Sequence, residues 1–272
     1  MRSNTGQILY IPRVGQRANL QHPLMKGCVA WWPLTDGGGG IAKDLVGRND
    51  GTLTSGISWA NSSLGNASEH PSAGGQYIST GLDLAGESAV TVSAWIRNDG
   101  SGLGNTFGKV ISQSHVGSFD TYINKTGNAS LAFDINSTTV YANNSDIPPI
   151  GTWFHVCFVW QQSVTQAVYI NGVLSNSGTA DSSVIGATTH NVFIGGTSAL
   201  IRPWDGGIQN VRILDRALSE SEVLQLYTNP WSGLSIPSAT RYFFVSQPQQ
   251  IFPPRMKLKT SINVSKGGRI VI

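Results

Sequence analysis

The chain has 272 residues, of which 40% are hydrophobic and 12% are charged, and its 32 glycines are typical of a turn-rich β protein. The absence of any run of about 18 apolar residues excludes a transmembrane helix. The first four residues lead into polar sequence without the apolar stretch of a secretory signal. We therefore expect a protein with a sizeable core that is made in the cytoplasm.

The net charge of +3 conceals a division along the chain. Residues 1–35 carry four bases and residues 223–272 carry six, and neither stretch has an acid, whereas residues 36–222 hold all 15 acids. The C-terminal end also has apolar runs such as 242–245 (YFFV), and such runs favour burial. Both ends are therefore expected to dock on neighbouring subunits or on an acidic surface, with freely solvated tails as the alternative.

In chain order, residues 1–26 are interpreted as an N-terminal arm with a short strand at 8–11. The Asn171-Gly172 pair predicts a tight hairpin turn. Short strands separated by turn residues are expected at 27–35, 76–82, 90–97, 109–113, 119–124, 130–135, 138–142, 153–160, 166–170, 191–195 and 207–213. Because no helices alternate with these strands, the pattern predicts an all-β fold of two packed antiparallel sheets, a sandwich or jelly roll, and excludes a parallel α/β sheet.

One short helix is expected near the C-terminus. Ser219, followed three residues later by Glu222, has the pattern of a capping box. The apolar residues that follow, Leu224 among them, predict a buried stripe. Asn229 and Pro230 end the helix.

From residue 233 the chain changes character, since prolines recur and the alternation of apolar residues returns only at 257–264. Residues 233–272 are therefore interpreted as an extended basic arm with one or two short strands. This leaves residues 27–232 as one folded domain.

Several segments carry a resemblance to a known family when they are taken together and in order. They are 29–34 (VAWWPL), 44–53 (DLVGRNDGTL), 90–96 (VTVSAWI), 153–156 (WFHV), 169–173 (YINGV), 194–196 (IGG) and 207–226. Residues 27–231 resemble the laminin-G-like, concanavalin A-like jelly rolls of lectins and glucanases. The tail beyond them looks like those of phage proteins that carry this module. The resemblance implies a β-sandwich used for binding or assembly, but a fold does not settle a function.

No active site is expected. Related glucanases use a strand that bears Glu, Asp and Glu on one face, whereas Glu220 and Glu222 lie on the predicted helix, and Glu69 and Glu87 have no second acid nearby in a strand. His155 lies in a predicted core strand and is interpreted as a packed structural residue. The chain is therefore expected not to be an enzyme.

The resemblance also implies one bound calcium ion between the early aspartate turn and the strand that precedes the helix. Asp44 matches the early carboxylate, Asn49 offers a carbonyl oxygen, and Asn210 stands where the family pattern often has Asp. Oxygen ligands are what calcium takes. In the alternative reading, the Asp44 side chain accepts from the amides of Val46 and Gly47 in an Asx turn.

A sugar would need exposed aromatic rings with polar partners. Trp59, Tyr122, Tyr141 and Trp204 are the candidates, because they lie in predicted loops or at strand edges. The alternative for each is a packing role.

These observations lead to two functional hypotheses. The first is a non-enzymatic virion structural protein (capsid decoration, fibre or tail-associated) that displays a lectin-like jelly roll. In this hypothesis residues 1–26 and 233–272 anchor the domain to other virion subunits or to further copies of itself. The second is a carbohydrate-binding module that recognises a surface glycan. Neither hypothesis involves specific nucleic-acid binding or insertion into a membrane.

Overall fold

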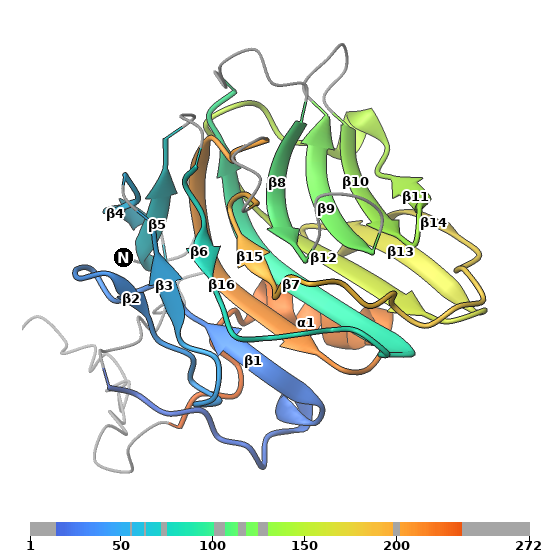
Figure 1. The fold of residues 1–272 in the computed structure, drawn as a ribbon, viewed down its shortest axis with the longest axis horizontal. Helices are drawn as coiled ribbons and strands as arrows, with labels where there is room; N and C mark the ends of the chain where they lie inside the picture. The colour runs from blue at the N-terminus through green and yellow to red at the C-terminus, as the bar shows by residue number, and fades with distance from the viewer. Residues whose placement is uncertain are drawn as a thin grey trace, which may run out of the picture. The chain divides into compact units, whose positions relative to one another are not determined.

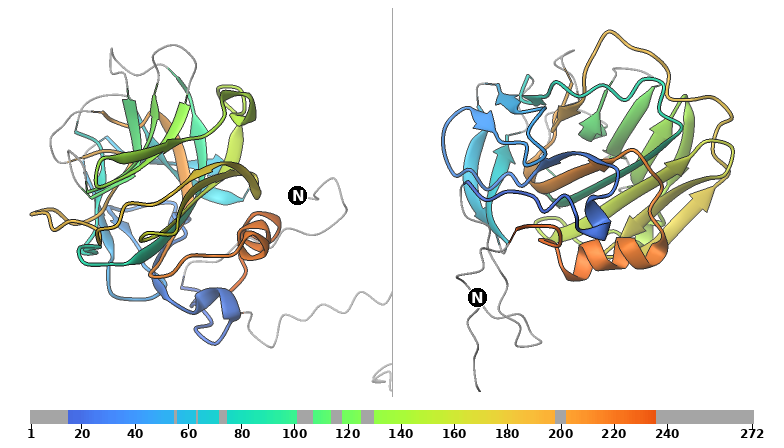
Figure 2. Two further views of the ribbon diagram at one scale, coloured as in Figure 1. Left: turned by 90° about the vertical axis from the view of Figure 1, so that its right-hand side faces the viewer. Right: turned by 90° about the horizontal axis from the view of Figure 1, so that it is seen from below.

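The computed structural model describes residues 15–54, 56–62, 64–71, 75–100, 107–113, 118–124, 130–197 and 202–235. In this part of the chain two antiparallel sheets pack face to face as a jelly-roll sandwich (Figure 1). Helix α1 (Glu220–Thr228) lies outside the two layers, as Figure 2 shows. The all-β fold predicted from the sequence is confirmed, and none of the described helices is long and apolar enough to span a membrane.

The first sheet is built around its longest strands. Its order is β14 (Val173–Gly178), β13 (Thr165–Ile170), β12 (Trp153–Gln161), β7 (Ala89–Asn98), β16 (Gly206–Leu214), β5 (Gly65–His70) and β4 (Ser58–Ser62), and β1 (Cys28–Trp32) also pairs with β16. β16 changes partner along its length, since residues 206–208 pair with β5 and residues 211–214 pair with β1. A bulge at Asn210, whose φ is 52°, separates the two pairings.

The second sheet faces the first across the core. Its order is β11 (Thr138–Tyr141), β10 (Ser130–Ile135), β9 (Phe119–Asn124), β8 (Phe107–Ser112), β15 (Phe193–Ile194), β6 (Ile78–Ser79), β3 (Gly51–Leu53) and β2 (Ile41–Ala42). The Asn176 side chain donates to the Tyr141 carbonyl, so β14 and β11 lie at the same end of the sandwich. The indole of Trp59 on β4 donates to the carbonyl of Gly39, just before β2, at the other end.

The core forms because alternate residues of each strand point inward. Side chains of both sheets, among them Trp32, Phe133, Phe158 and Ile208, are fully buried in one cluster. The opposite face of β12 and β13 packs against α1, which buries Val223 and Leu226. The capping box of α1 is present as predicted, but Leu224 is 46% exposed, so its predicted burial is wrong.

The folded unit takes in residues on both sides of the predicted domain limits of 27 and 232. A 3-10 helix, Pro23–Met25, buries Leu24 and Met25 against two of the hydrophobic clusters. The compact unit ends at Ser235. The parts of the predicted arms within 15–26 and 233–235 therefore pack on the domain, whereas the expected strands at 8–11 and 257–264 lie outside the described residues.

The two ends of this unit lie side by side. The amide of Asn19 donates to the Gly233 carbonyl at 2.6 Å, and the amide of Ser235 donates to the Arg17 carbonyl at 2.9 Å. Ala18 lies between them and pairs with Leu234 as an antiparallel bridge. The chain thus enters and leaves the described domain at one place.

Two histidines are fully buried. His155 lies on β12, as its sequence context predicted, and its Nε2 is 2.8 Å from the Ser93 hydroxyl. The Nε2 of His70 on β5 is 3.0 Å from the Ser68 hydroxyl. Burial lowers the pKa of each imidazole to about 3, because the charged form would lose its hydration.

These histidines predict that the protein loses stability as the pH falls below neutrality. In the unfolded chain a histidine titrates near 6.5, so between pH 6.5 and 3 the unfolded state binds more protons than the folded state. The free energy of unfolding should fall by up to about 1.4 kcal/mol per pH unit for each histidine. Urea unfolding followed by tryptophan fluorescence at pH 7 and pH 4.5 measures this loss.

The two histidines together account for one part of the fall in the free energy of unfolding with falling pH. His155→Gln and His70→Gln should each remove about half of that part. Burial raises the pKa of Asp120 to about 7, which acts in the opposite direction over the same range. The difference between variant and parent in how the free energy of unfolding changes with pH therefore isolates the histidine contribution. The same pH dependence in the parent and both variants would contradict the explanation.

Candidate functional site

The outward face of β8 to β11 brings two of the predicted aromatic residues together. Tyr122 on β9 and Tyr141 on β11 both lie directly opposite Ala132 on β10, so the two rings share a face. This is the face away from the core, because Phe133 and Ile123 point inward. Tyr141 is 44% exposed and Tyr122 is half-buried. Figure 1 shows the four strands side by side.

A buried ion pair lies beside the tyrosines. The ammonium of Lys109 on β8 contacts the carboxylate of Asp120 on β9 and lies 5.4 Å from the centre of the Tyr122 ring. Burial lowers the pKa of Lys109 and raises that of Asp120 to about 7. The low polarity of the site thus opposes both charges, and their mutual attraction offsets only part of that effect.

A second carboxylate completes the polar face. Asp134 on β10 is the cross-strand partner of both Asp120 and Thr139. It accepts hydrogen bonds from the Thr139 hydroxyl and, at 3.2 Å, from the Ser137 amide. Burial, reinforced by a hydrogen bond with Tyr141, raises the pKa of the Tyr122 phenol, which therefore stays neutral. We name Lys109, Asp120, Tyr122, Asp134, Thr139 and Tyr141 the tyrosine face.

The remaining aromatic candidates lie elsewhere. Trp204 was expected in a loop or at an edge, but its side chain is fully buried in the main core, so the structure corrects that expectation. Its segment runs into β16, and its amide donates to the Gly195 carbonyl, which draws the ring inside the sandwich. Trp59 is half-buried at the opposite end from Tyr141 and does not contribute to the same face.

Asp44, the predicted early carboxylate, is surrounded by backbone donors. One oxygen accepts from the amides of Trp31 and Val46, both at 2.9 Å. The other accepts from the amides of Arg48 at 3.3 Å and Asn49 at 3.0 Å. The alternative reading of Asp44 as a turn residue thus holds for Val46, but Arg48 and Asn49 donate where Gly47 was expected.

The other two predicted calcium ligands are also engaged. The Asn49 carbonyl accepts from the indole of Trp32 at 2.7 Å. The Asn210 amide accepts from the indole of Trp31 and donates to the Pro230 carbonyl, both at 2.7 Å. Among the described residues, no three or more His, Cys, Asp or Glu side chains gather as a metal site. These oxygens therefore do not fit a calcium ion, which needs six to eight oxygen ligands.

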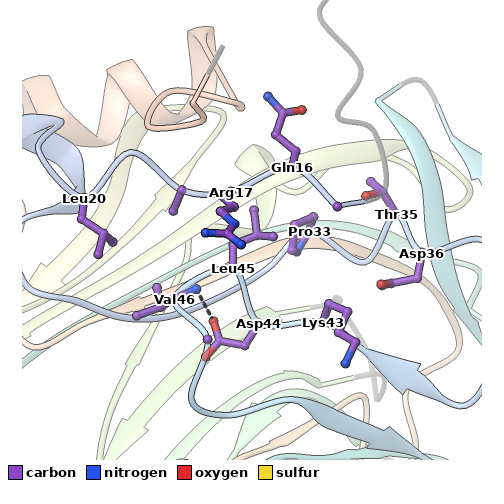
Figure 3. Close-up of a pocket in the computed structure, with 13 residues that line it drawn as sticks. Gln16, Arg17, Leu20, Pro33, Thr35, Asp36, Lys43, Asp44, Leu45 and Val46 are labelled. Atoms are coloured by element: carbon purple, nitrogen blue, oxygen red, sulfur yellow. Dashed lines mark hydrogen bonds between the residues drawn. The ribbon is translucent and has the colours of Figure 1, made fainter. Parts of the chain in front are cut away.

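A cavity of about 570 Å³ lies next to the Asp44 turn. Figure 3 shows Gln16, Arg17 and Leu20 along one side and residues 43–46 along the other. Its lining also includes Pro33 and Asp36, and burial raises the pKa of the Asp36 carboxyl. Of the predicted site residues, Asp44 alone lines this cavity.

Solved structures show the same fold at low sequence identity. Domain 4 of AbnA, a GH43 extracellular arabinanase from Geobacillus stearothermophilus, was solved in complex with arabinotriose and is 22% identical. It has a TM-score of 0.55, and the alignment covers 74% of this chain and 98% of that domain.

Two further structures belong to larger proteins. The ligand-binding domain of botulinum neurotoxin serotype D, in complex with N-acetylneuraminic acid, is 17% identical with a TM-score of 0.56. The Trypanosoma rangeli sialidase, in complex with 2,3-difluorosialic acid, is 16% identical with a TM-score of 0.55. Each alignment covers 74% of this chain, but only 50% of the neurotoxin domain and 33% of the sialidase.

Among curated proteins, none matches the chain in sequence. The sequence pattern of the Concanavalin A-like lectin/glucanases superfamily, in contrast, matches residues 72–224, which is more than half of the chain. This stretch includes the strands that carry the tyrosine face and the strand that precedes α1. The chain therefore belongs to the concanavalin A-like lectin/glucanases superfamily.

Proposed function

We propose that this domain binds a glycan on the tyrosine face without acting on it. The observation that carries the proposal is the placement of Tyr122 and Tyr141 on one outward face beside Asp134. The apolar side of a sugar ring packs well on an exposed aromatic ring. Its hydroxyl groups donate to carboxylates in charge-assisted hydrogen bonds.

The solved relatives support a binding role through their fold. The arabinanase domain and the neurotoxin domain were each solved with a carbohydrate ligand. Their identity to this chain is too low to carry over a ligand, so the sugar has to be inferred from the residues of this chain. On the tyrosine face, the exposed ring of Tyr141, the half-buried ring of Tyr122 and the half-buried carboxylate of Asp134 are the groups that a sugar can reach.

The carboxylates favour binding over hydrolysis. Asp120 is 4% exposed and is held by Lys109, and Asp134 already accepts from Thr139. Glu69 pairs with Arg97 at 2.6 Å. A glycosidase needs two carboxyl groups that are free to flank one glycosidic bond. These carboxylates are engaged by Lys109, Thr139 and Arg97, so they are not free to do so.

The ends of the chain support a second proposal, that the domain is displayed by a virion and anchored through its arms. Both ends of the described domain leave from one place, beside Arg17 and Ser235. Residues 1–14 carry two bases, residues 236–272 carry six, and neither segment has an acid. Two basic segments that leave together favour attachment to an acidic partner surface, such as other virion subunits or further copies of this chain.

Tyr141→Ala should weaken glycan binding about tenfold, because it removes a ring contact worth roughly 1.4 kcal/mol. Tyr141→Phe keeps the ring and should retain most of the affinity. A glycan array identifies the ligand, and calorimetry then gives the dissociation constants. Val173→Ala, at a residue on β14 that is 66% exposed, is the matched control and should bind like the parent protein.

Trp59→Ala distinguishes between the two ends of the sandwich. Loss of binding in this variant, with full binding by Tyr141→Ala, would move the site away from the tyrosine face. A glycan array without any signal would contradict the glycan-binding function itself.

The anchoring proposal predicts a difference in mass. The full chain should form an oligomer of more subunits in light scattering than a chain that ends at Ser235, because residues 236–272 are the proposed attachment. A full-length variant with the six bases of that segment replaced by glutamine separates charge from chain length. The same number of subunits in all three proteins would overturn self-association through this segment.

A further inference from the structure

Arg212 is a fully buried cation that the glycan-binding face does not use. One of its terminal nitrogens donates to the Ser232 carbonyl at 2.7 Å, and the other donates to the Pro230 carbonyl at 2.5 Å. Its guanidinium lies 3.6 Å from the centre of the Trp31 ring. Burial lowers the pKa of this guanidinium to about 9, which still leaves it charged at pH 7.

The partners of Arg212 are unusual for a buried charge. Within the described part of the chain, none of the ion pairs includes Arg212. Its charge is instead balanced by carbonyl oxygens and by the face of an indole, which attracts cations. Neutral carbonyl oxygens are also among the ligands that a calcium ion takes.

Asn210 belongs to the same cluster. Its amide nitrogen donates to the Pro230 carbonyl, and its oxygen accepts from the indole of Trp31. The Pro230 carbonyl therefore receives hydrogen bonds from both Asn210 and Arg212. Trp31 also joins the cluster to the early turn, because its backbone amide donates to Asp44. The guanidinium thus shares the Pro230 carbonyl with Asn210, one of the three predicted calcium ligands.

We propose that Arg212, a cation built into the chain, acts together with backbone and indole donors to satisfy the oxygens that a divalent metal ion would bind in this region, so that the fold needs no calcium. The oxygens of Asp44, Asn49 and Asn210 already accept hydrogen bonds, and the Pro230 carbonyl next to Asn210 is held by the guanidinium. Unlike a metal ion, a cation attached to the chain cannot be removed by a chelator. It also fastens residues 230–232, which follow α1, to β1 and β16.

The first test is thermal unfolding of the full chain in EDTA, in about 5 mM calcium chloride and in the same concentration of magnesium chloride. The Tm should be the same in all three. A calcium ion bound with a dissociation constant near 0.1 mM would raise the Tm by roughly 5 °C at this concentration. A rise of that size in calcium alone would overturn the proposal.

The second test is Arg212→Lys, which keeps the charge but loses the planar fork that reaches two carbonyls and stacks on Trp31. Its Tm should fall by about 10 °C and should not recover in calcium. Arg48→Lys, at an exposed position, is the matched control and should leave the Tm unchanged. A Tm for Arg212→Lys equal to that of the parent would also overturn the proposal. If Arg212→Lys does not fold, the calcium measurement on the parent protein still decides.

Discussion

The architecture depends on the point at which β16 exchanges one neighbour for another. A left-handed residue at Asn210 interrupts the pairing with β5 and lets the same strand continue with β1. Asparagine tolerates this conformation better than most residues do, and its side chain is then free to reach Trp31 and Pro230. One backbone irregularity thus joins the first strand, the central strand and the segment after the helix.

Much of the fold was predictable because the long strands are rich in apolar and β-branched residues and are bounded by turn residues. The strands 119–124 and 130–135 agree with the structure residue for residue, and the cap of α1 is where its capping box indicated. β4 and β5 were not predicted, since their sequences SWANS and GNASEH lack an apolar alternation. Small or polar side chains such as Ala67, Ser68 and His70 fill the buried positions of β5, so burial there depends on neighbours distant in sequence.

The site was predictable only in part. Tyr122 and Tyr141 were proposed one at a time, and strand pairing was needed to bring them together. The same alternation could have added Asp120 and Asp134, because both occupy outward positions of predicted strands. No local signal marks Arg212, since an arginine in a strand ordinarily faces water. Trp204 was predicted as an exposed aromatic residue but is buried, because the position of a residue in a loop does not determine its burial.

The adjacency of the two ends of the domain has an evolutionary consequence. A module whose entry and exit points are joined by an antiparallel bridge occupies little more room in a host chain than a surface hairpin does. Such a module could be inserted into a loop of an unrelated protein, or moved from one gene to another, without separating the host residues on either side of the insertion. The short pairing of Ala18 with Leu234 would thus allow the lectin-like domain to be inserted as a unit into other proteins.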